Sequence, residues 1–185
     1  SLSRGGIIWH TQGSGKSLSM VFLARKIRHV TELSNATIVV VTDRIDLDNQ
    51  IFNTFMRTLS GTTTPVHAET VSEMKKLLSL AQPQVITTTI QKFQSDKDDK
   101  VVLKDEKQGT GLNFEKEFEV LTTKSNVIVL ADEAHRSQYK EMARNMRDAL
   151  PNAAFIGFTG TPIDREDKST PRTFGSYIDK YSIQQ

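Results

Sequence analysis

The sequence predicts an α/β domain with a mostly parallel sheet and helices on both faces of that sheet. Strand-like and helix-like segments alternate along its 185 residues. Two strand-like segments, 38–41 and 127–131, are continuous apolar runs, which are typical of strands buried on both faces. A glycine-rich turn at 10–17 joins the first strand to the first helix. In such folds ligands bind at the carboxyl ends of the strands, so the polar segments that follow the strands are the candidate functional residues.

The first strand and the first helix are predicted from the apolar run at 7–9 and from the helical spacing after the turn. The helix is expected from Lys16 to about Val30, and basic residues near its end suit the negative end of the helix dipole. We expect its apolar residues to form one broad buried face, made of Leu18, Val21, Phe22, Leu23 and Ile27.

The later elements follow from capping residues and apolar spacing. Asp43 can cap a second helix, and Thr70 with Glu73 forms a capping box that opens a third helix. Residues 95–124 break the alternation with a charged run and a Gly-Thr-Gly segment, so we interpret them as a surface insertion with solvated charges. The third helix should end at Leu80, a fourth should cover 139–150, and strands should cover 38–41, 85–90, 127–131 and 154–158.

Composition excludes several classes of protein. Hydrophobic residues make up 37% and charged residues 25% of the chain, as in soluble globular domains. No apolar run approaches the roughly 20 residues that cross a bilayer, and the first residues do not resemble a signal peptide, so we expect no membrane contact. The lack of cysteine excludes disulfides and thiolate metal sites and fits a cytoplasmic location. The net charge of +2 is too small to predict nucleic-acid binding by itself.

The glycine-rich turn has the composition of a phosphate-binding loop, because the amides of such a turn and of the following helix point toward one anion. Gly13 and Gly15 allow close approach of the backbone. Lys16 would reach the β- and γ-phosphates of a nucleotide, and Ser17 would place its hydroxyl on Mg²⁺. His10 stands where the general pattern has glycine. The alternative is an ordinary turn that caps a helix. The predicted nucleotide-binding residues of the loop are Thr11, Gln12, Gly13, Ser14, Gly15, Lys16 and Ser17.

Two carboxylates directly follow the strand at 127–131. Asp132 could hold Mg²⁺ through water, and Glu133 could act as the catalytic base that orients the water attacking the γ-phosphate. His135 could sense the γ-phosphate or bridge to Thr159 and Thr161. A metal-ligand role is not expected for it, because no second histidine or cysteine lies at ligand spacing. The alternative is a helix N-terminus with favourably placed acids.

Thr159, Gly160 and Thr161 follow the strand at 154–158. The hydroxyl groups of Thr159 and Thr161 could hydrogen-bond the acidic cluster, and the segment could report the nucleotide state to a DNA-binding side of the domain. By itself this is a common turn sequence, and its position after a strand is what favours the coupling role.

The segments H-T-Q-G-S-G-K-S, D-E-A-H and T-G-T-P, in this order, resemble those of superfamily 2 helicases and translocases. Five longer blocks are similar to the motor subunit of type I restriction endonucleases, in which histidine also replaces the first glycine of the loop. These blocks are G-G-I-I-W-H-T-Q-G-S-G-K-S-L, V-V-V-T-D-R-I-D-L-D-N-Q, T-T-I-Q-K-F, A-D-E-A-H-R-S-Q-Y and F-T-G-T-P-I. The resemblance implies a RecA-like P-loop fold and ATP-driven translocation along double-stranded DNA, in complex with methyltransferase and specificity subunits, followed by cleavage.

The resemblance also implies two segments that grip the DNA backbone. Hydroxyl groups, a guanidinium and helix N-termini at strand ends suit phosphate oxygens. Without the resemblance, Arg44 and Lys92 would be interpreted as solvated surface charges. The implied DNA-binding residues are Thr42, Asp43, Arg44, Thr88, Thr89, Gln91 and Lys92.

Motors of this kind bind ATP between two RecA-like domains, the second of which supplies arginine fingers, and the restriction subunit also carries a nuclease domain. We therefore expect residues 1–165 to be the first motor domain of a larger polypeptide and residues 166–185 to begin a connector to the second. Because an arginine finger contributes about 10³–10⁵ in rate, the chain alone should hydrolyse ATP barely above background.

Other functions remain as alternatives. A DNA or RNA helicase of repair or processing would separate strands, which a strand-displacement assay detects. A nucleotide-sensing scaffold would bind ATP and partner subunits without turnover, and the presence of Lys16 and Glu133 argues against it. A P-loop kinase is disfavoured because the acidic and threonine segments follow their strands in motor order and no acceptor-binding lid is evident.

Overall fold

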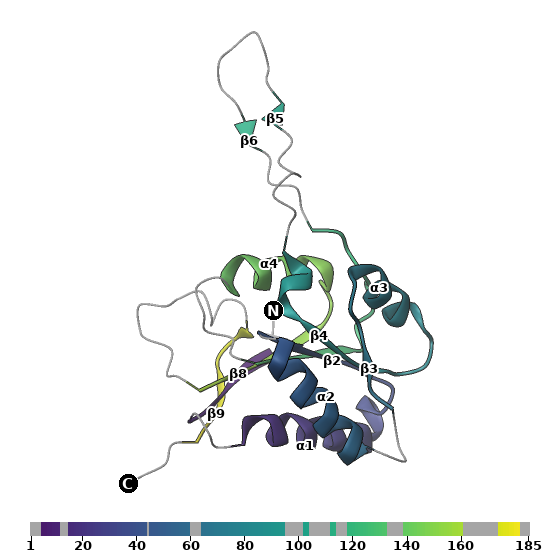
Figure 1. Cartoon of the computed structure of the whole chain (residues 1–185), viewed down its shortest axis with the longest axis vertical. Coiled ribbons are helices and arrows are strands. Elements are labelled where there is room, and N and C mark those ends of the chain that lie inside the picture. Colours follow the sequence, from purple (N-terminus) through teal and green to yellow (C-terminus); the bar gives the residue numbers. More distant parts are fainter. Residues whose placement is uncertain are drawn as a thin grey trace.

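The computed structural model describes residues 5–11, 15–43, 45–59, 64–94, 102–103, 112–113, 118–132, 139–160 and 174–181. Within these residues, the centre of the protein is a seven-stranded sheet in the order β3-β4-β2-β7-β8-β1-β9, with parallel pairing throughout (Figure 1). The strands are β1 (Gly5–His10), β2 (Thr37–Thr42), β3 (Val66–His67), β4 (Val85–Thr89), β7 (Val127–Asp132), β8 (Ala154–Thr159) and β9 (Tyr177–Tyr181).

Helices cover both faces of the sheet. Figure 1 shows α1 and α2 on one side and α3 and α4 on the other. None of the helices in the described ranges is long and apolar enough to cross a membrane. The α-helices are α1 (Lys16–His29), α2 (Ile45–Leu59), α3 (Val71–Ser79) and α4 (Tyr139–Ala149), and the short 3₁₀ helices are η1 (Thr31–Leu33) and η2 (Ile90–Phe93).

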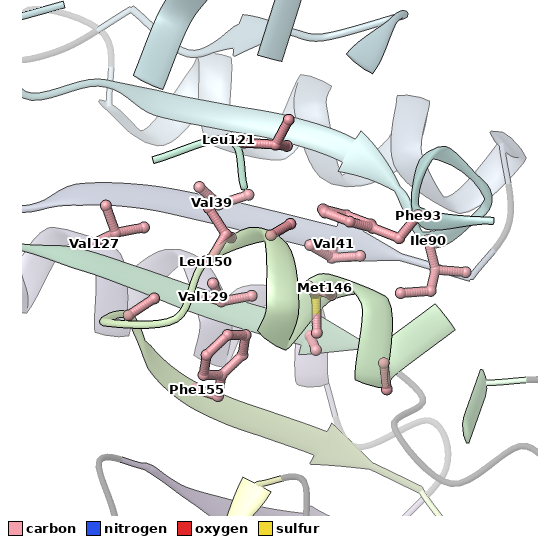
Figure 2. Packing of buried hydrophobic residues seen from close by; sticks show 14 of the residues in the cluster. Val39, Val41, Ile90, Phe93, Leu121, Val127, Val129, Met146, Leu150 and Phe155 are labelled. Carbon is pink, nitrogen blue, oxygen red and sulfur yellow. The ribbon is translucent and has the colours of Figure 1, made fainter. Parts of the chain in front are cut away.

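The predicted α/β class is confirmed. Every residue of β2 and of β7 is buried, as expected for apolar runs in the middle of a parallel sheet. Alternate residues of a strand point to opposite faces, so the two strands contribute to two separate cores. One core is formed with α1 and α2 and includes Met20, Ala24, Phe55, Ile38, Val40, Leu130 and Phe158. The other is formed with α3 and α4 and includes Leu78, Met146, Val39, Val41, Val129 and Phe155 (Figure 2).

The helix α1 has the predicted bounds to within one residue, but the predicted buried face is partly wrong. Leu18 and Phe22 are 50% and 59% exposed. Phe22 lies two residues from both Met20 and Ala24, which places it on the opposite side of the helix. The side that packs on the sheet contains Met20, Val21, Ala24 and Ile27. The small side chain of Ala24 belongs to this narrower stripe, which the count of large apolar residues did not reveal.

The predicted capping box at the start of α3 is confirmed. The Glu73 N–H donates to Thr70 Oγ1 at 3.1 Å, and the Thr70 N–H donates to Glu73 Oε2 at 3.2 Å. At the other end, Lys124 Nζ donates to the carbonyls of Leu78 and Leu80, at 2.8 and 2.7 Å. A lysine from a distant segment thus satisfies carbonyl groups that the end of a helix leaves free.

The predicted surface insertion at 95–124 is shorter than expected. Its described parts include a two-stranded antiparallel sheet of β5 (Val102–Leu103) and β6 (Leu112–Asn113), which stands apart from the main sheet (Figure 1). Leu121, in contrast, is 6% exposed within the core, and its N–H donates to Ala149 O at 2.9 Å. The ring of Phe118 lies 5.9 Å from that of Phe93. Residues 118–124 are therefore part of the domain body, held by two apolar side chains among polar neighbours.

The sheet also extends past residue 165, the predicted boundary of the domain. β9 pairs with β1, in a segment that was expected to begin a connector. A side chain at Gly5 would meet the Phe155 backbone, and one at Gly6 would meet the Ile178 side chain, so the glycine pair lets both neighbours approach β1. Edge strands such as β9 are partly exposed and carry polar residues, which hides them from an apolar pattern.

Candidate functional site

The carboxyl edge of the sheet brings together segments that the sequence assigns to a nucleotide. β8 lies between β1 and β7, so the loop after β1 and the acid that ends β7 are two strand spacings apart, or about 10 Å. In the register, Trp9 of β1 pairs with Thr159, and Phe158 pairs with Asp132 of β7. The predicted coupling residue Thr159 therefore lies on the strand between β1, which leads into the glycine-rich turn, and β7, which ends in the acid.

Lys16 and Asp132 meet across this edge. The Lys16 Nζ lies 4.0 Å from Asp132 Oδ1, and the two side chains are 11% and 7% exposed. Lys16 begins α1 directly after Gly15, whose φ of 82° lies in the left-handed region that favours glycine. Asp132 is the last residue of β7. A helix start and a strand end thus hold a cation and an anion in a place with little water, where each lowers the free-energy cost of burying the other.

Two hydroxyl groups lie at the ends of the glycine-rich turn that precedes α1. Thr11 directly follows β1, and its Oγ1 is buried without a hydrogen-bond partner in the described part of the chain. Ser17 is the second residue of α1 and is half-buried. A buried hydroxyl without a partner costs free energy, so Thr11 fits a site where a ligand supplies the missing acceptor.

The coupling segment and the rest of the loop are described in part. Thr159 is fully buried at the end of β8, and Gly160 is half-buried. The other residues predicted for nucleotide binding, catalysis or coupling lie outside the described ranges: Gln12, Gly13, Ser14, Glu133, His135 and Thr161.

The two predicted DNA segments end side by side, because β2 and β4 are neighbours and Thr42 pairs with Thr89. The side chains of Thr42, Thr88 and Thr89 are buried, and Thr88 Oγ1 donates to Ala68 O at 3.0 Å. This burial does not fit direct contacts between these hydroxyl groups and DNA. Central strands are covered on both faces, so hydroxyl groups within them are buried. The sequence segments with the DNA-binding resemblance include strand residues as well as the loop residues that follow, and the sequence alone does not show which of them are accessible.

The loop residues after these strands are more accessible. Gln91 is exposed, and its Nε2 donates to the Asp43 carbonyl at 2.7 Å. Lys92 is half-buried, and Arg44 lies outside the described residues. Groups able to reach a ligand at this part of the edge therefore come from η2 and from the residues after β2.

Sequence reasoning missed Asn145 of α4. This residue is 8% exposed, and its Nδ2 donates to the Phe93 carbonyl of η2 at 2.7 Å. A signal was present, since Asn145 lies at helical spacing from Met142 and Ala149 on an apolar face. A polar residue on such a face needs a hydrogen-bond partner, but the partner is 52 positions away in the sequence.

A family model, described as SWI2/SNF2 ATPase, matches residues 1–185. The chain belongs to the SWI2/SNF2 ATPase family. Membership of this family implies that the protein uses a nucleotide.

This SWI2/SNF2 ATPase is also similar to endonuclease subunits of type I restriction enzymes. It is 45% identical to the type I restriction enzyme HindI endonuclease subunit of Haemophilus influenzae and 31% identical to the type I restriction enzyme SsaAORF53P endonuclease subunit of Staphylococcus saprophyticus, in each case over 98% of this chain. The resemblance drawn from the motifs is thereby confirmed. The chain spans 17% and 18% of the length of these two relatives.

Solved structures support the fold. The Pyrococcus furiosus Hef helicase domain matches with a TM-score of 0.63 at 20% identity, covering 96% of this chain and 35% of that one. A nuclease-deletion mutant of the type ISP restriction-modification enzyme LlaGI, in complex with a DNA substrate mimic, matches with a TM-score of 0.61 at 14% identity, covering 97% of this chain and 18% of that one. At these identities the likeness concerns the fold alone, and it confirms the RecA-like arrangement of the SWI2/SNF2 ATPase.

Proposed function

We propose that this SWI2/SNF2 ATPase is the first motor domain of a type I restriction enzyme, in which ATP hydrolysis drives translocation along double-stranded DNA before cleavage. The observation that carries the proposal is the buried pair of Lys16 and Asp132 at the carboxyl edge of the sheet. A cation and an acid beside a glycine-rich turn are what a nucleoside triphosphate and its magnesium ion require. The similarity to the Haemophilus influenzae endonuclease subunit supports the assignment to a restriction system.

The residues at the edge fit ATP and Mg²⁺. Lys16 would bind the β- and γ-phosphates, and the buried Thr11 hydroxyl would donate a hydrogen bond that it does not make within the described chain. Ser17 and Asp132 would hold Mg²⁺, for which hydroxyl and carboxylate oxygens are suitable ligands. Bound there, ATP supplies a γ-phosphoryl group whose transfer to water releases free energy. The remaining loop residues, Gln12, Gly13, Ser14 and Gly15, would contribute backbone amides.

The other predicted residues have distinct proposed roles. Glu133 would orient the attacking water and accept its proton, and His135 would sense the γ-phosphate. Thr159, Gly160 and Thr161 would report the state of the nucleotide to the DNA side. The place of β8 between β1 and β7 supports this last role.

We propose that double-stranded DNA lies along the edge formed by the ends of β2 and β4. Arg44 and Lys92 would provide the charges for its phosphates, and Asp43 with its neighbours would provide backbone amides. The buried hydroxyl groups of Thr42, Thr88 and Thr89 would then shape the strand ends without touching DNA.

The complete protein is proposed to contain more than this domain. The chain spans 17% of the Haemophilus influenzae subunit. We infer a longer polypeptide with a second RecA-like domain, which supplies arginine fingers, and a nuclease domain. That polypeptide would assemble with methyltransferase and specificity subunits, whose DNA recognition would direct it.

The first test is Lys16→Ala in the full-length polypeptide. Loss of the charge that stabilises the transferring phosphoryl group should lower DNA-stimulated ATP hydrolysis by about 100-fold or more. Lys26→Ala is the matched control, because it removes an exposed lysine from the same helix. ATP hydrolysis that is equal in the two variants would contradict the proposed site.

The second test separates translocation from strand separation. A translocase on double-stranded DNA displaces the third strand of a triplex placed on its path but leaves the duplex intact. We expect the full-length polypeptide with its partner subunits to do this in the presence of ATP and Mg²⁺. Release of single strands from a plain duplex would instead favour a helicase.

A further inference from the structure

We propose that Asn145 and Gln91 are positioning residues that fasten both DNA segments to the helix following the acidic strand. This inference rests on the proposed function and goes beyond it, because it names the contacts through which the nucleotide site would act on the DNA site. The contacts run from α4 to η2 and from η2 to the end of β2.

The first contact joins α4 to η2. The Asn145 side chain is 8% exposed, and its Nδ2 donates to the Phe93 carbonyl at 2.7 Å. Its neighbours on that face, Met146 and Ala149, are apolar and buried. An amide in such surroundings costs free energy unless it is hydrogen-bonded, whereas an apolar residue would have no such requirement. The hydrogen bond that this amide donates therefore holds the last residue of η2 against α4.

The body of η2 is fixed by apolar packing. Ile90 and Phe93 are fully buried in the same core as Val41 of β2 and Met146 of α4. Figure 2 shows Ile90 and Phe93 gathered near Val41, with Met146 on the adjoining helix. η2 therefore contacts both α4 and β2, and a displacement of α4 would act on η2 through these contacts.

The second contact joins η2 to the residue after β2. Gln91 is exposed, yet its Nε2 donates to the Asp43 carbonyl at 2.7 Å. The two residues are 48 positions apart and belong to different DNA segments. The Gln91 amide thus ties one segment to the other, which is a positioning role and differs from a direct contact with DNA.

Together these contacts form a connection from the nucleotide side to the DNA side. Asp132 ends β7, and α4 begins seven residues later at Tyr139. Asn145 and Gln91 then link α4 to η2 and η2 to Asp43. A change at the acidic strand end that shifts α4 would therefore move both DNA segments as one unit.

The test uses Asn145→Leu, Gln91→Leu and the double variant in the full-length polypeptide. Leucine has a similar size but no amide donor. The readouts are ATP hydrolysis without DNA, its maximum with DNA, and the DNA concentration at half-maximal stimulation. We expect Asn145→Leu to keep the rate without DNA and each single variant to need about fivefold more DNA. The double variant should need no more DNA than the single variant that needs the most, because breaking either contact already interrupts the connection.

Asn126→Ala is the matched control. Asn126 Nδ2 also donates to a distant backbone carbonyl, that of Asn35 at 2.9 Å, but it lies at the amino edge of the sheet. This variant should leave the DNA requirement unchanged. If Asn145→Leu does not fold, Gln91→Met provides the test, because it removes the donor from an exposed side chain without adding a charge that would repel DNA, and it should again raise the DNA requirement.

Each other outcome has a definite meaning. If the unmodified polypeptide shows no DNA-stimulated ATP hydrolysis, the proposed function fails. If stimulation is present and the effects of the two variants multiply, Gln91 and Asn145 act separately and this inference is overturned. It is overturned equally if the Gln91 and Asn145 variants behave like Asn126→Ala.

Discussion

The two edges of the sheet use polar side chains in different ways. At the amino edge, polar side chains fasten one element to another through backbone carbonyls. Arg28, near the end of α1, donates to the carbonyls of Ser34 and Gln84 at 3.1 and 2.8 Å. Asn126, which precedes β7, donates to the carbonyl of Asn35. These bonds join the starts of neighbouring strands and have an evident structural use.

At the carboxyl edge, the polar groups are arranged differently. Lys16 and Asp132 lie 4.0 Å apart, beyond hydrogen-bonding distance, and the Thr11 hydroxyl is buried without a partner in the described part of the chain. The comparison teaches that the amino edge uses its polar side chains to join elements. The carboxyl edge instead gathers a cation, an acid and a buried hydroxyl without a partner in the described chain where a ligand is expected.

The largest expected effect is on the rate of ATP hydrolysis when the chain is produced without the rest of the polypeptide. The chain of 185 residues by itself should be folded, because both cores lie within it, but it should hydrolyse ATP about 10³-fold or more slowly than the full-length polypeptide, because the proposed arginine fingers are supplied by another domain. Circular dichroism with a phosphate-release assay measures both properties. A turnover near that of the full-length polypeptide would show that this edge is a complete site.

A smaller effect is expected at the amino edge. Arg28→Ala removes two hydrogen bonds to backbone carbonyls, so the free energy of unfolding should fall by about 2 kcal/mol. Burial already lowers the pKa of Arg28, and the group stays charged at neutral pH, so the loss should not depend on pH between about 6 and 8. Urea denaturation measures it. ATP hydrolysis by the full-length variant should change by less than about twofold, and a larger change would break the distinction between the edges.

The smallest effect is expected from removing one hydroxyl group, that of Thr11, at the carboxyl edge. Thr11→Val keeps the shape of the side chain and removes a buried hydroxyl that has no partner in the described chain. Stability should stay the same or rise by up to about 1 kcal/mol, while the affinity for ATP should fall about fivefold. Thermal denaturation and nucleotide titration of the same preparation give both values. A loss of stability without a loss of affinity would place Thr11 among the structural residues.

Much of the fold could be predicted because its signals are local. The start of α1, the capping box of Thr70 and Glu73 and the buried strands depend on a few consecutive residues. The meeting of Lys16 with Asp132 could be anticipated for a similar reason. In a parallel sheet, all carboxyl ends share one edge whatever the strand order is. A position directly after a strand is therefore sufficient to predict that a residue lies at this edge.

Other features could not be predicted, because they depend on which surfaces meet. Leu18 and Phe22 have the spacing of core residues, yet the sheet contacts a different side of α1. Leu121 is buried while its neighbour Val120 is exposed, because only Leu121 packs in the core beside α4. β9 is held by backbone pairing with β1, and no pattern of side chains predicts this pairing.

By itself, the sequence determined the α/β class, the glycine-rich turn before the first helix and the likeness to type I restriction subunits, because these depend on short runs of residues in a fixed order. Only the tertiary structure decided that β8 lies between β1 and β7, that three predicted DNA-binding threonines are buried, and that Gln91 and Asn145 bond to carbonyls 48 and 52 positions away. Contacts over such separations arise from the packing of whole elements, and no short segment contains the information that specifies them.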